Sequence, residues 1–460
     1  MQTHYAVSMS RNGAAGQQRA RAASPGWAAA AALALMALAA PAGAGGAFPG
    51  AAGFGADTPG GRGGPVIAVT SLADAGPGTL RAALEDTAGP RIVIFAVEGE
   101  IALTRQIVAG GGLTLLGQVA PGEGVVVSGA RLLITGDDAI VRGMRLRPGD
   151  GPGQDPSARD GLTVGGNGHR ARRVVIDGNS FAWATDENAS IWGDAEDVTF
   201  SNNIVAEGLG TGRTAVGHGM GLLVGSGARR VSIHGNLFHS NWTRNPQIGR
   251  ADVVEIVNNL VTNPRIGAVE INTAPTRVDV LGNVLEAGPD TLTPRSRPLI
   301  ALQVGDPGFR VFLSNNLTPL GADVARGPGA DATEPARVAA GSGLPVLPAS
   351  DVRARVLAAA GARWPRLDAV DARIVAEAAA GRGRLIDSPA DAGDPPRAMA
   401  SGDAATHARA RDRDGDGDGV PDAAELALGS DPLTPDSHRI PAGSPYAYIE
   451  LYAETLSRRR

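Results

Sequence analysis

Acidic residues near the C-terminus are spaced like the ligands of a calcium loop. Asp414, Asp416 and Asp418 alternate along the chain, and Gly419 stands at the sixth position, where an EF-hand loop turns sharply. A glutamate occupies the twelfth position. We therefore predict a calcium site whose ligands are the side chains of Asp414, Asp416, Asp418, Asp422 and Glu425 and the backbone carbonyl of Val420. Asp431 and Asp436 are acids that extend this site, and we expect its role to be structural.

The composition excludes several classes of protein. The chain has 460 residues and no cysteine, which excludes a disulfide framework, a cysteine-ligated zinc site and a thiol nucleophile. With 43% hydrophobic and 19% charged residues, wholesale disorder is also excluded. The net charge of −5 argues against a nucleic-acid-binding surface. An acidic substrate would need local cations, either arginine side chains or a metal.

The first 44 residues have the layout of a secretory signal. They contain three arginines and no acid, then an apolar run from Trp27 to Ala40, then Ala42-Gly43-Ala44 as a cleavage pattern. The run is too short to favour a transmembrane helix. We expect a secreted or periplasmic monomer with no membrane span after cleavage. The alternative is an apolar anchor that is never cleaved.

A short pattern recurs through the middle of the chain. Alternating β-branched residues are followed by a small or polar residue and then by asparagine, and the six copies end at Asn179, Asn203, Asn236, Asn259, Asn283 and Asn316. No 10–15-residue amphipathic helix separates them, so a βαβ sheet is not expected. Repeated units of this size predict an all-β fold, a right-handed parallel β-helix with the asparagines at one corner. A β-sandwich is the alternative fold.

From Phe48 onward the chain resembles the pectate lyase family of polysaccharide lyases, in the branch of exported bacterial proteins with a calcium-loop tail. Its opening segments carry part of this resemblance, at 48–55, 60–64, 69–81 and 91–101. Three further patches carry the chemistry: Arg159-Asp160-Gly161, the segment 180–190, and the segment 236–259 with Arg244-Asn245-Pro246.

The resemblance implies a groove on the outside of the β-helix, in which carboxylates on successive coils hold Ca²⁺. The matching positions are Asp160, Asp186 and Glu187 as calcium ligands and Arg244 as the catalytic base. Arg250, His218 and Trp183 are predicted to bind substrate. The implied reaction is β-elimination in a (1→4)-linked galacturonan, an acidic plant cell-wall polysaccharide, with calcium acting as a Lewis acid.

Four positions depart from the family pattern, and the first is Gly178, where many members have histidine. Ser190 replaces a second carboxylate, Met220 replaces a lysine that contacts substrate, and Gln247 stands where arginine is common. The last three departures favour a second hypothesis, a non-catalytic β-helix that binds a glycan. A hydrolase is a third, but it needs two carboxylates that flank one bond. Asp186 and Glu187, adjacent in sequence, do not support that arrangement.

The asparagine repeat ends near residue 320, and the composition then changes. We predict five segments: a signal peptide at 1–44, the β-helix at 45–320, a connection with short helices at 321–387, a linker at 388–411 and the calcium-binding tail at 412–460. Short helices are expected at 351–360, 369–380 and 444–456.

Overall fold

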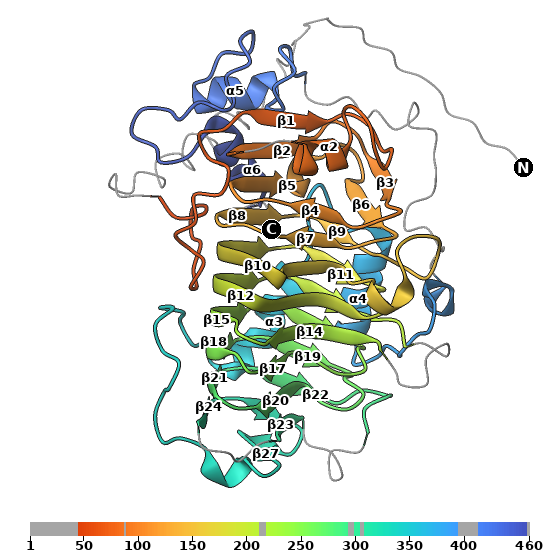
Figure 1. The fold of residues 1–460 in the computed structure, drawn as a ribbon, viewed down its shortest axis with the longest axis vertical. Helices are drawn as coiled ribbons and strands as arrows, with labels where there is room; N and C mark the ends of the chain where they lie inside the picture. Colours follow the sequence, from red (N-terminus) through yellow and green to blue (C-terminus); the bar gives the residue numbers. More distant parts are fainter. Residues whose placement is uncertain are drawn as a thin grey trace, which may run out of the picture. The chain divides into compact units, whose positions relative to one another are not determined.

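The protein is described here from a computed structural model, which covers residues 45–86, 89–210, 218–292, 299–303, 308–393 and 413–457. Short parallel strands stack coil upon coil through most of this length (Figure 1). The predicted β-helix is therefore confirmed. The predicted signal peptide at 1–44 and most of the predicted linker at 388–411 lie outside the described residues.

The strands form three faces, and the first two are one continuous sheet because β10 and β12 run through both. The first face is the stack of β4 (Ile107–Ala109), β7 (Leu132–Ile134), the start of β10 (Leu162–Asp177), the start of β12 (Glu187–Ser201), β14 (Met220–Gly225), β17 (Gln247–Gly249), β20 (Val269–Thr273), β23 (Ile300–Leu302) and β27 (Ala325–Arg326). The second face is the stack of β1 (Val66–Val69), β2 (Arg91–Phe95), β5 (Leu113–Leu116), β8 (Ala139–Arg142), the ends of β10 and β12, β15 (Arg229–His234), β18 (Asp252–Val257), β21 (Thr276–Leu281) and β24 (Phe309–Ser314).

The third face is a separate sheet. It contains β3 (Gly99–Ala102), β6 (Val125–Ser128), β9 (Arg145–Leu146), β11 (Ser180–Ala182), β13 (Ile204–Ala206), β16 (Leu237–His239), β19 (Leu260–Thr262), β22 (Val284–Glu286), β25 (Leu317–Thr318) and β26 (Gly321–Ala322). Its strands are parallel except for the pairing of β25 with β26.

The core follows from the alternation of residues along each strand. Val198, Val231 and Val254 occupy the same register position on three successive coils of the second face, and each is 0% exposed. Because side chains alternate between the two sides of a strand, every second residue points into the coil. β-branched side chains pack well on such a pleated surface, and they join one continuous core along the stack.

A ladder of buried asparagines runs along the corner between the second and third faces. From Asn203 onward, each side-chain carbonyl accepts from the backbone N–H and the amide of the asparagine one coil before it, at 2.8–3.1 Å. Its members are Asn179, Asn203, Asn236, Asn259, Asn283 and Asn316. The carbonyl of the first member, Asn179, accepts from the Met144 N–H at 2.9 Å. At the far end, Asp323 Oδ1 accepts from the backbone N–H and the amide of Asn316, both at 2.8 Å. The ladder satisfies polar groups that the turn would otherwise bury without partners.

The residue before each ladder asparagine adopts a left-handed backbone conformation. Its φ is 64° at Gly178, 52° at Asn202, 68° at Gly235, 53° at Asn258, 63° at Gly282 and 60° at Asn315. Glycine and asparagine are the residues that tolerate this region most readily. The small or polar position of the sequence repeat is therefore a requirement of the turn.

Other segments cover the outer sides of the second and third faces. On the second face, Phe54 donates its backbone N–H to Ser232 at 3.1 Å, and Arg337 forms an ion pair with Glu255 at 2.6 Å. On the third face, the helices α3 (Ala349–Ala359) and α4 (Ala369–Ala379) bury Val352 and Ile374 in one cluster with strand residues. No described segment from outside the coils is hydrogen-bonded across the outer side of the first face at β12, β14 and β17. The outer side of the first face therefore remains open, and the candidate site lies there.

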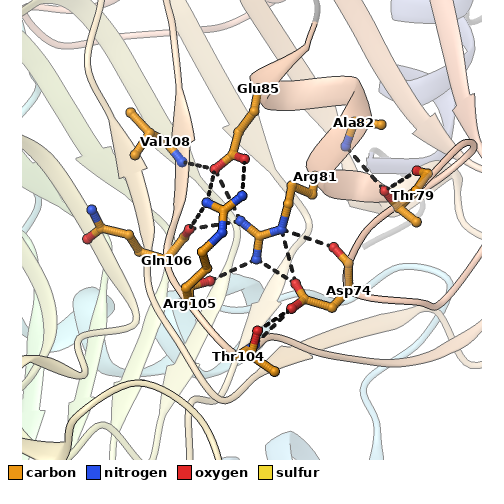
Figure 2. Close-up of polar contacts among 10 residues, drawn as sticks. Asp74, Thr79, Arg81, Ala82, Glu85, Thr104, Arg105, Gln106 and Val108 are labelled. Carbon is orange, nitrogen blue, oxygen red and sulfur yellow. Dashed lines mark hydrogen bonds and ion pairs between the residues drawn. The ribbon is translucent and has the colours of Figure 1, made fainter.

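A short helix, α2 (Leu80–Glu85), closes the first coil through one arginine (Figure 2). Arg81 is 5% exposed and forms ion pairs with Asp74 at 2.5 Å and with Glu85 at 3.1 Å. It also donates to the carbonyls of Arg105 and Gln106, both at 2.9 Å. One guanidinium therefore ties the helix to the turn before β4.

The ends of the predicted segments differ from the structure in detail. The β-helix continues to Arg326, because β27 pairs with β23 beyond the predicted end at 320. The tail contains α5 (Asp422–Leu428) and α6 (Tyr448–Ser457) and buries Val420 and Ile449 against Ile94 of the second face. The short 3-10 helices are η1 (Gly117–Val119), η2 (Pro156–Ala158), η3 (Ala330–Ala332) and η4 (Pro389–Ala392). No helix in the described part of the chain is long and apolar enough to cross a membrane.

Candidate active site

Three predicted calcium ligands meet at the edge where the chain enters the first face. Asp160 lies just before β10, and Asp186 and Glu187 lie at the start of β12 on the next coil. The parallel register pairs Leu162 with Ala189, which brings the acids side by side. One carboxylate oxygen from each acid lies within 4.8 Å of the other two. The structure thus gathers residues that are up to 27 positions apart into one acidic group.

Among the three acids of this group, Asp160 makes the most polar contacts with its surroundings. Its Oδ2 accepts from the Thr163 hydroxyl at 2.8 Å and from the Ser190 hydroxyl at 3.4 Å, and it forms an ion pair with Arg131 at 3.4 Å. Burial raises the pKa of Asp160 to about 6, with a further contribution from the charge of Asp186, while Thr163 and Arg131 oppose the shift. A divalent cation would neutralise like charges that are gathered in such a largely buried place.

Arg244 reaches the same group from two coils further along the stack. It lies in the loop before β17 with a φ of 62°, and its Nη1 donates to Glu187 Oε1. Its side chain is 21% exposed. Burial lowers the pKa of Arg244, against the charges of Asp186, Glu270 and Asp160. The predicted base therefore stands beside the predicted calcium ligands, partly shielded from water.

Glu270, which sequence reasoning missed, supports the backbone of Arg244. It lies on β20, is 4% exposed, and accepts through Oε2 from the Thr243 hydroxyl at 2.5 Å and from the Arg244 N–H at 3.2 Å. A non-glycine residue in the left-handed region persists only where its surroundings hold it. The signal for Glu270 is the register between β17 and β20, which pairs Gln247 with Glu270 and is not visible in the sequence alone. Arg131 was missed for the same reason, whereas Thr163 lies only three positions after Asp160 and belongs to no motif.

His218 and Met220 occupy the coil between Glu187 and Arg244. His218 Nδ1 lies 3.2 Å from Asp186 Oδ1, and the side chain is 38% exposed. It is therefore beside the acids, and its contact with substrate remains a prediction. Met220 is 8% exposed and pairs in register with Glu187, so no cation stands at that point of the site.

The structure separates the other two predicted substrate-binding residues. Arg250 is exposed in the turn between β17 and β18 and has no ion pair within the described residues, so its role remains a prediction. The prediction for Trp183 is wrong. Its ring is 1% exposed inside the cluster beneath α3 and α4, and its indole N–H donates to Glu207 at 3.1 Å. A ring enclosed on both sides has no surface to offer a sugar.

The acidic loop of the tail forms a second group of carboxylates. Oxygens of Asp414, Asp416 and Asp418 lie within 4.8 Å of one another, and so do oxygens of Asp418, Glu425 and Asp436. Burial raises the pKa of Glu425 to about 7, together with the charges of Asp418 and Asp416. One buried oxygen each of Asp416, Glu425 and Asp436 has no hydrogen-bond partner within the described residues. Hard oxygen donors left without partners fit a calcium ion.

The other residues predicted for the calcium site of the tail differ in their positions. Asp422 Oδ1 accepts from the Gly415 N–H at 2.6 Å and its carboxylate pairs with Arg413 at 3.3 Å, outside both groups. Its contact with an ion, directly or through water, remains a prediction, as does that of the Val420 carbonyl. Asp436 lies in the triplet with Asp418 and Glu425, as predicted for an extension of the site. Asp431 instead caps a turn in the tail.

Comparison with known proteins gives relatives along most of the chain. No family model matches. A protein named probable pectate lyase C from Neosartorya fischeri is 34% identical over 432 residues, which cover 89% of this chain and 93% of the relative. A protein of the same name from Aspergillus flavus is 36% identical over 430 residues, which cover 89% of this chain and 94% of the relative.

Solved structures share the fold at low sequence identity. The crystal structure of jun a 1, the major allergen from cedar pollen, aligns with a TM-score of 0.52 and 17% identity, over 68% of this chain and 92% of that one. A pectate lyase bound to hexasaccharide aligns with a TM-score of 0.51 and 15% identity, over 70% of this chain and 99% of that one. These structures bear on the fold alone.

Proposed function

The chain belongs to the pectate lyase family, and we propose that it is an exported, calcium-dependent lyase that cleaves (1→4)-linked galacturonan by β-elimination. Polysaccharide lyase activity on pectate follows from the curated relatives, which are about a third identical to this chain over most of their length. The same relatives favour an enzyme over a non-catalytic glycan-binding β-helix. The calcium dependence, the export and the roles of individual residues are our proposals.

One contact carries the assignment of the site, the ion pair between Arg244 and Glu187. It joins the only predicted base to the acidic group of Asp160, Asp186 and Glu187 on the first face. This face is where a long polymer can lie, since the other two faces are covered by α3, α4 and the terminal segments. Substrate, base and acids can therefore meet there.

The reaction needs a base near C5 of a uronide and a path for the leaving group at C4. In the proposed reaction a guanidine nitrogen of Arg244 takes the C5 proton. The C5–H electron pair becomes a double bond between C4 and C5, and the C4–O bond breaks with its electrons on the leaving oxygen. Water supplies a proton to that oxygen. Arginine normally keeps its proton until the pH exceeds about 12, so we expect activity to rise at alkaline pH.

The acidic group fits a calcium ion on the evidence of its own residues. Asp160 is 5% exposed, and its pKa is raised mainly by burial and further by the charge of Asp186, so its ionised form is one that a bound cation would stabilise. Asp160, Asp186 and Glu187 would hold the ion, which would withdraw charge from the substrate carboxylate next to C5. Arg131 and Arg244 balance part of the charge at either end.

We assign a structural calcium ion to the tail, held by Asp414, Asp416, Asp418, Glu425 and Asp436. The partnerless buried oxygens in this group support the assignment. The signal-like layout of residues 1–44 supports export to the periplasm or the medium, where calcium is available to both groups.

The decisive experiment follows the ultraviolet absorbance of unsaturated uronide during incubation with polygalacturonate at alkaline pH. We expect signal from the wild-type protein with calcium, and loss of most of it with a chelator or with Arg244→Ala. The matched control is Arg229→Ala, because Arg229 is a half-exposed arginine that pairs with Glu196 away from the site. Folded wild-type protein that releases no unsaturated product would refute the proposal, and equal losses in both variants would refute the role of Arg244.

A further inference from the structure

Trp192 stands on the outer side of the first face. It lies on β12 directly after Ile191, which is 0% exposed and points into the coil, so alternation turns the indole outward. The side chain is half-buried, and its indole N–H makes no hydrogen bond within the described residues. The ring is therefore both partly open to solvent and free to use its polar edge.

Glycines surround this ring on the neighbouring coils. Gly165 is the register partner of Trp192 on the preceding coil, and Gly225 follows Val224, the partner of Ile191 on the next coil. A Cβ added at Gly166 would lie 2.4 Å from the indole nitrogen, so the ring rests directly on that glycine backbone. One side of the indole is thus supported by the backbone of Gly166. The register neighbours of Trp192 on the adjacent coils are glycines, so no large side chain stands beside the ring.

A supported flat ring with small neighbours suits the apolar C–H side of a pyranose. Aromatic rings offer a large apolar surface and, in tryptophan, a polar handle for a hydroxyl group. A residue that only filled the coil would be turned inward, as Trp183 is. Trp192 instead occupies the face on which the proposed reaction takes place.

The distance from the acidic group matches a neighbouring sugar of the same chain. Ser190 precedes Trp192 by two residues on the same side of β12, and its hydroxyl lies 3.4 Å from Asp160 Oδ2. Two strand residues span about 7 Å, a length comparable with one sugar residue. A polymer bound at the acids can therefore extend over the indole.

We infer that Trp192 is a sugar-stacking subsite, which binds the apolar side of a uronide residue next to the one that reacts. This inference rests on the proposed galacturonan site and adds to it a residue that determines how substrate is held. It assigns to Trp192 the role that the sequence suggested for the buried Trp183.

The test measures binding of galacturonan oligomers, with calcium present, in an Arg244→Ala background that does not consume them. Calorimetry should give about fivefold to tenfold weaker binding with Trp192→Ala, in line with the usual strength of an aromatic contact. Trp192→Phe should keep most of the affinity, because it keeps a flat ring. The control is Leu433→Ala, a 78% exposed aliphatic residue in the C-terminal tail, which should change binding by less than about twofold.

A second readout is tryptophan fluorescence. Oligomers should change the emission of the parent protein, and Trp192→Phe should abolish that change. Unaltered affinity in Trp192→Ala, or an equal loss in Leu433→Ala, would overturn the subsite. A wild-type protein that yields no unsaturated product would instead overturn the proposed lyase, so the two failures are distinct.

Discussion

Arg244 and Glu187 are 57 positions apart in the sequence and form an ion pair across two coils of the first face. The same arginine is held at its backbone by Glu270, so one acid orients its guanidinium and another its main chain. The base of the proposed reaction is therefore held by one acid from an earlier coil and by another acid from the next coil. A base placed in this way depends on residues that never touch substrate.

Removal of Glu270 should disturb the base without disturbing calcium. Glu270→Ala takes away the acceptor for the Thr243 hydroxyl and the Arg244 N–H, so we expect kcat to fall by up to about 100-fold with little change in KM. Glu270→Gln keeps an acceptor oxygen and should restore most of the activity. Steady-state kinetics and calcium calorimetry check this, and a normal kcat in Glu270→Ala would contradict it.

A carboxylate at position 190 should strengthen calcium binding in the groove. The Ser190 hydroxyl lies 3.4 Å from Asp160 Oδ2, so Ser190→Asp adds a fourth acid to the group. We expect about tenfold higher calcium affinity, since affinity follows the charge of the ligand set. Without calcium, repulsion should lower the melting temperature. Calorimetry and thermal unfolding measure the two effects, and Ser190→Asn, which adds no charge, should show neither.

Calcium should change how the stability of the tail depends on pH. Without calcium, the folded state binds more protons than the unfolded chain between the ordinary pKa of Glu425 near 4.5 and its raised pKa near 7. Stability of the metal-free tail should therefore fall as pH rises through this window. Calcium replaces the proton, so with saturating calcium neither the folded nor the unfolded state binds a proton at Glu425 over most of this window, and the stability should stay nearly constant.

Thermal unfolding at both ends of that window, with calcium and with a chelator, measures this difference in pH dependence. Glu425→Gln cannot titrate and serves as the control, because its metal-free stability should lose this part of the pH dependence. A metal-free wild-type protein that becomes more stable as pH rises from 5 to 7 would contradict the prediction.

Val253 should be a site of backbone strain. It has a φ of 57°, and a β-branched residue is strongly disfavoured there. Val253→Asn should stabilise the protein by about 1 kcal/mol, because asparagine tolerates the left-handed region. Urea unfolding checks the gain, and Val253→Ile, which keeps the branched side chain, should leave stability unchanged.

The asparagine ladder should be intolerant of gaps. Asn236 accepts from the N–H and amide of Asn203 and donates to Asn259 and to the carbonyl of Phe200. Asn236→Ala leaves several buried polar groups without partners, so we expect a loss of about 3 kcal/mol or more. Asn202→Gly, beside the ladder and left-handed already, should cost less than about 1 kcal/mol. Equal losses in a denaturant titration would contradict the ladder's role.

The fold was predictable because every coil repeats the same backbone requirement at one turn. A left-handed position before every ladder asparagine accepts glycine or asparagine, and that restriction shows in the sequence. The covering of the second face was not predictable. Val420 meets Ile94 across more than 300 positions, and no local pattern encodes such a contact.

The site was predictable to the extent that motifs marked it. Asp160, Asp186, Glu187 and Arg244 come together as the family resemblance implied. Glu270 acts through strand register, which the sequence does not display. Trp183 misled because its residue type suits sugar stacking, while its left-handed turn at φ 65° and its bond to Glu207 take the ring into the core.

Asp323 gives the stack a direction and an end. It accepts from Asn316 as another asparagine would, but its carboxylate has no amide hydrogen to pass to a further coil. The antiparallel pairing of β26 with β25 then turns the chain back over the last edge of the third face. An open edge of parallel strands is a template for copies of the same chain, and such stacks grow end to end into fibres. A side chain that accepts hydrogen bonds but cannot pass one on therefore helps to keep this end of the stack from pairing with another copy of the chain.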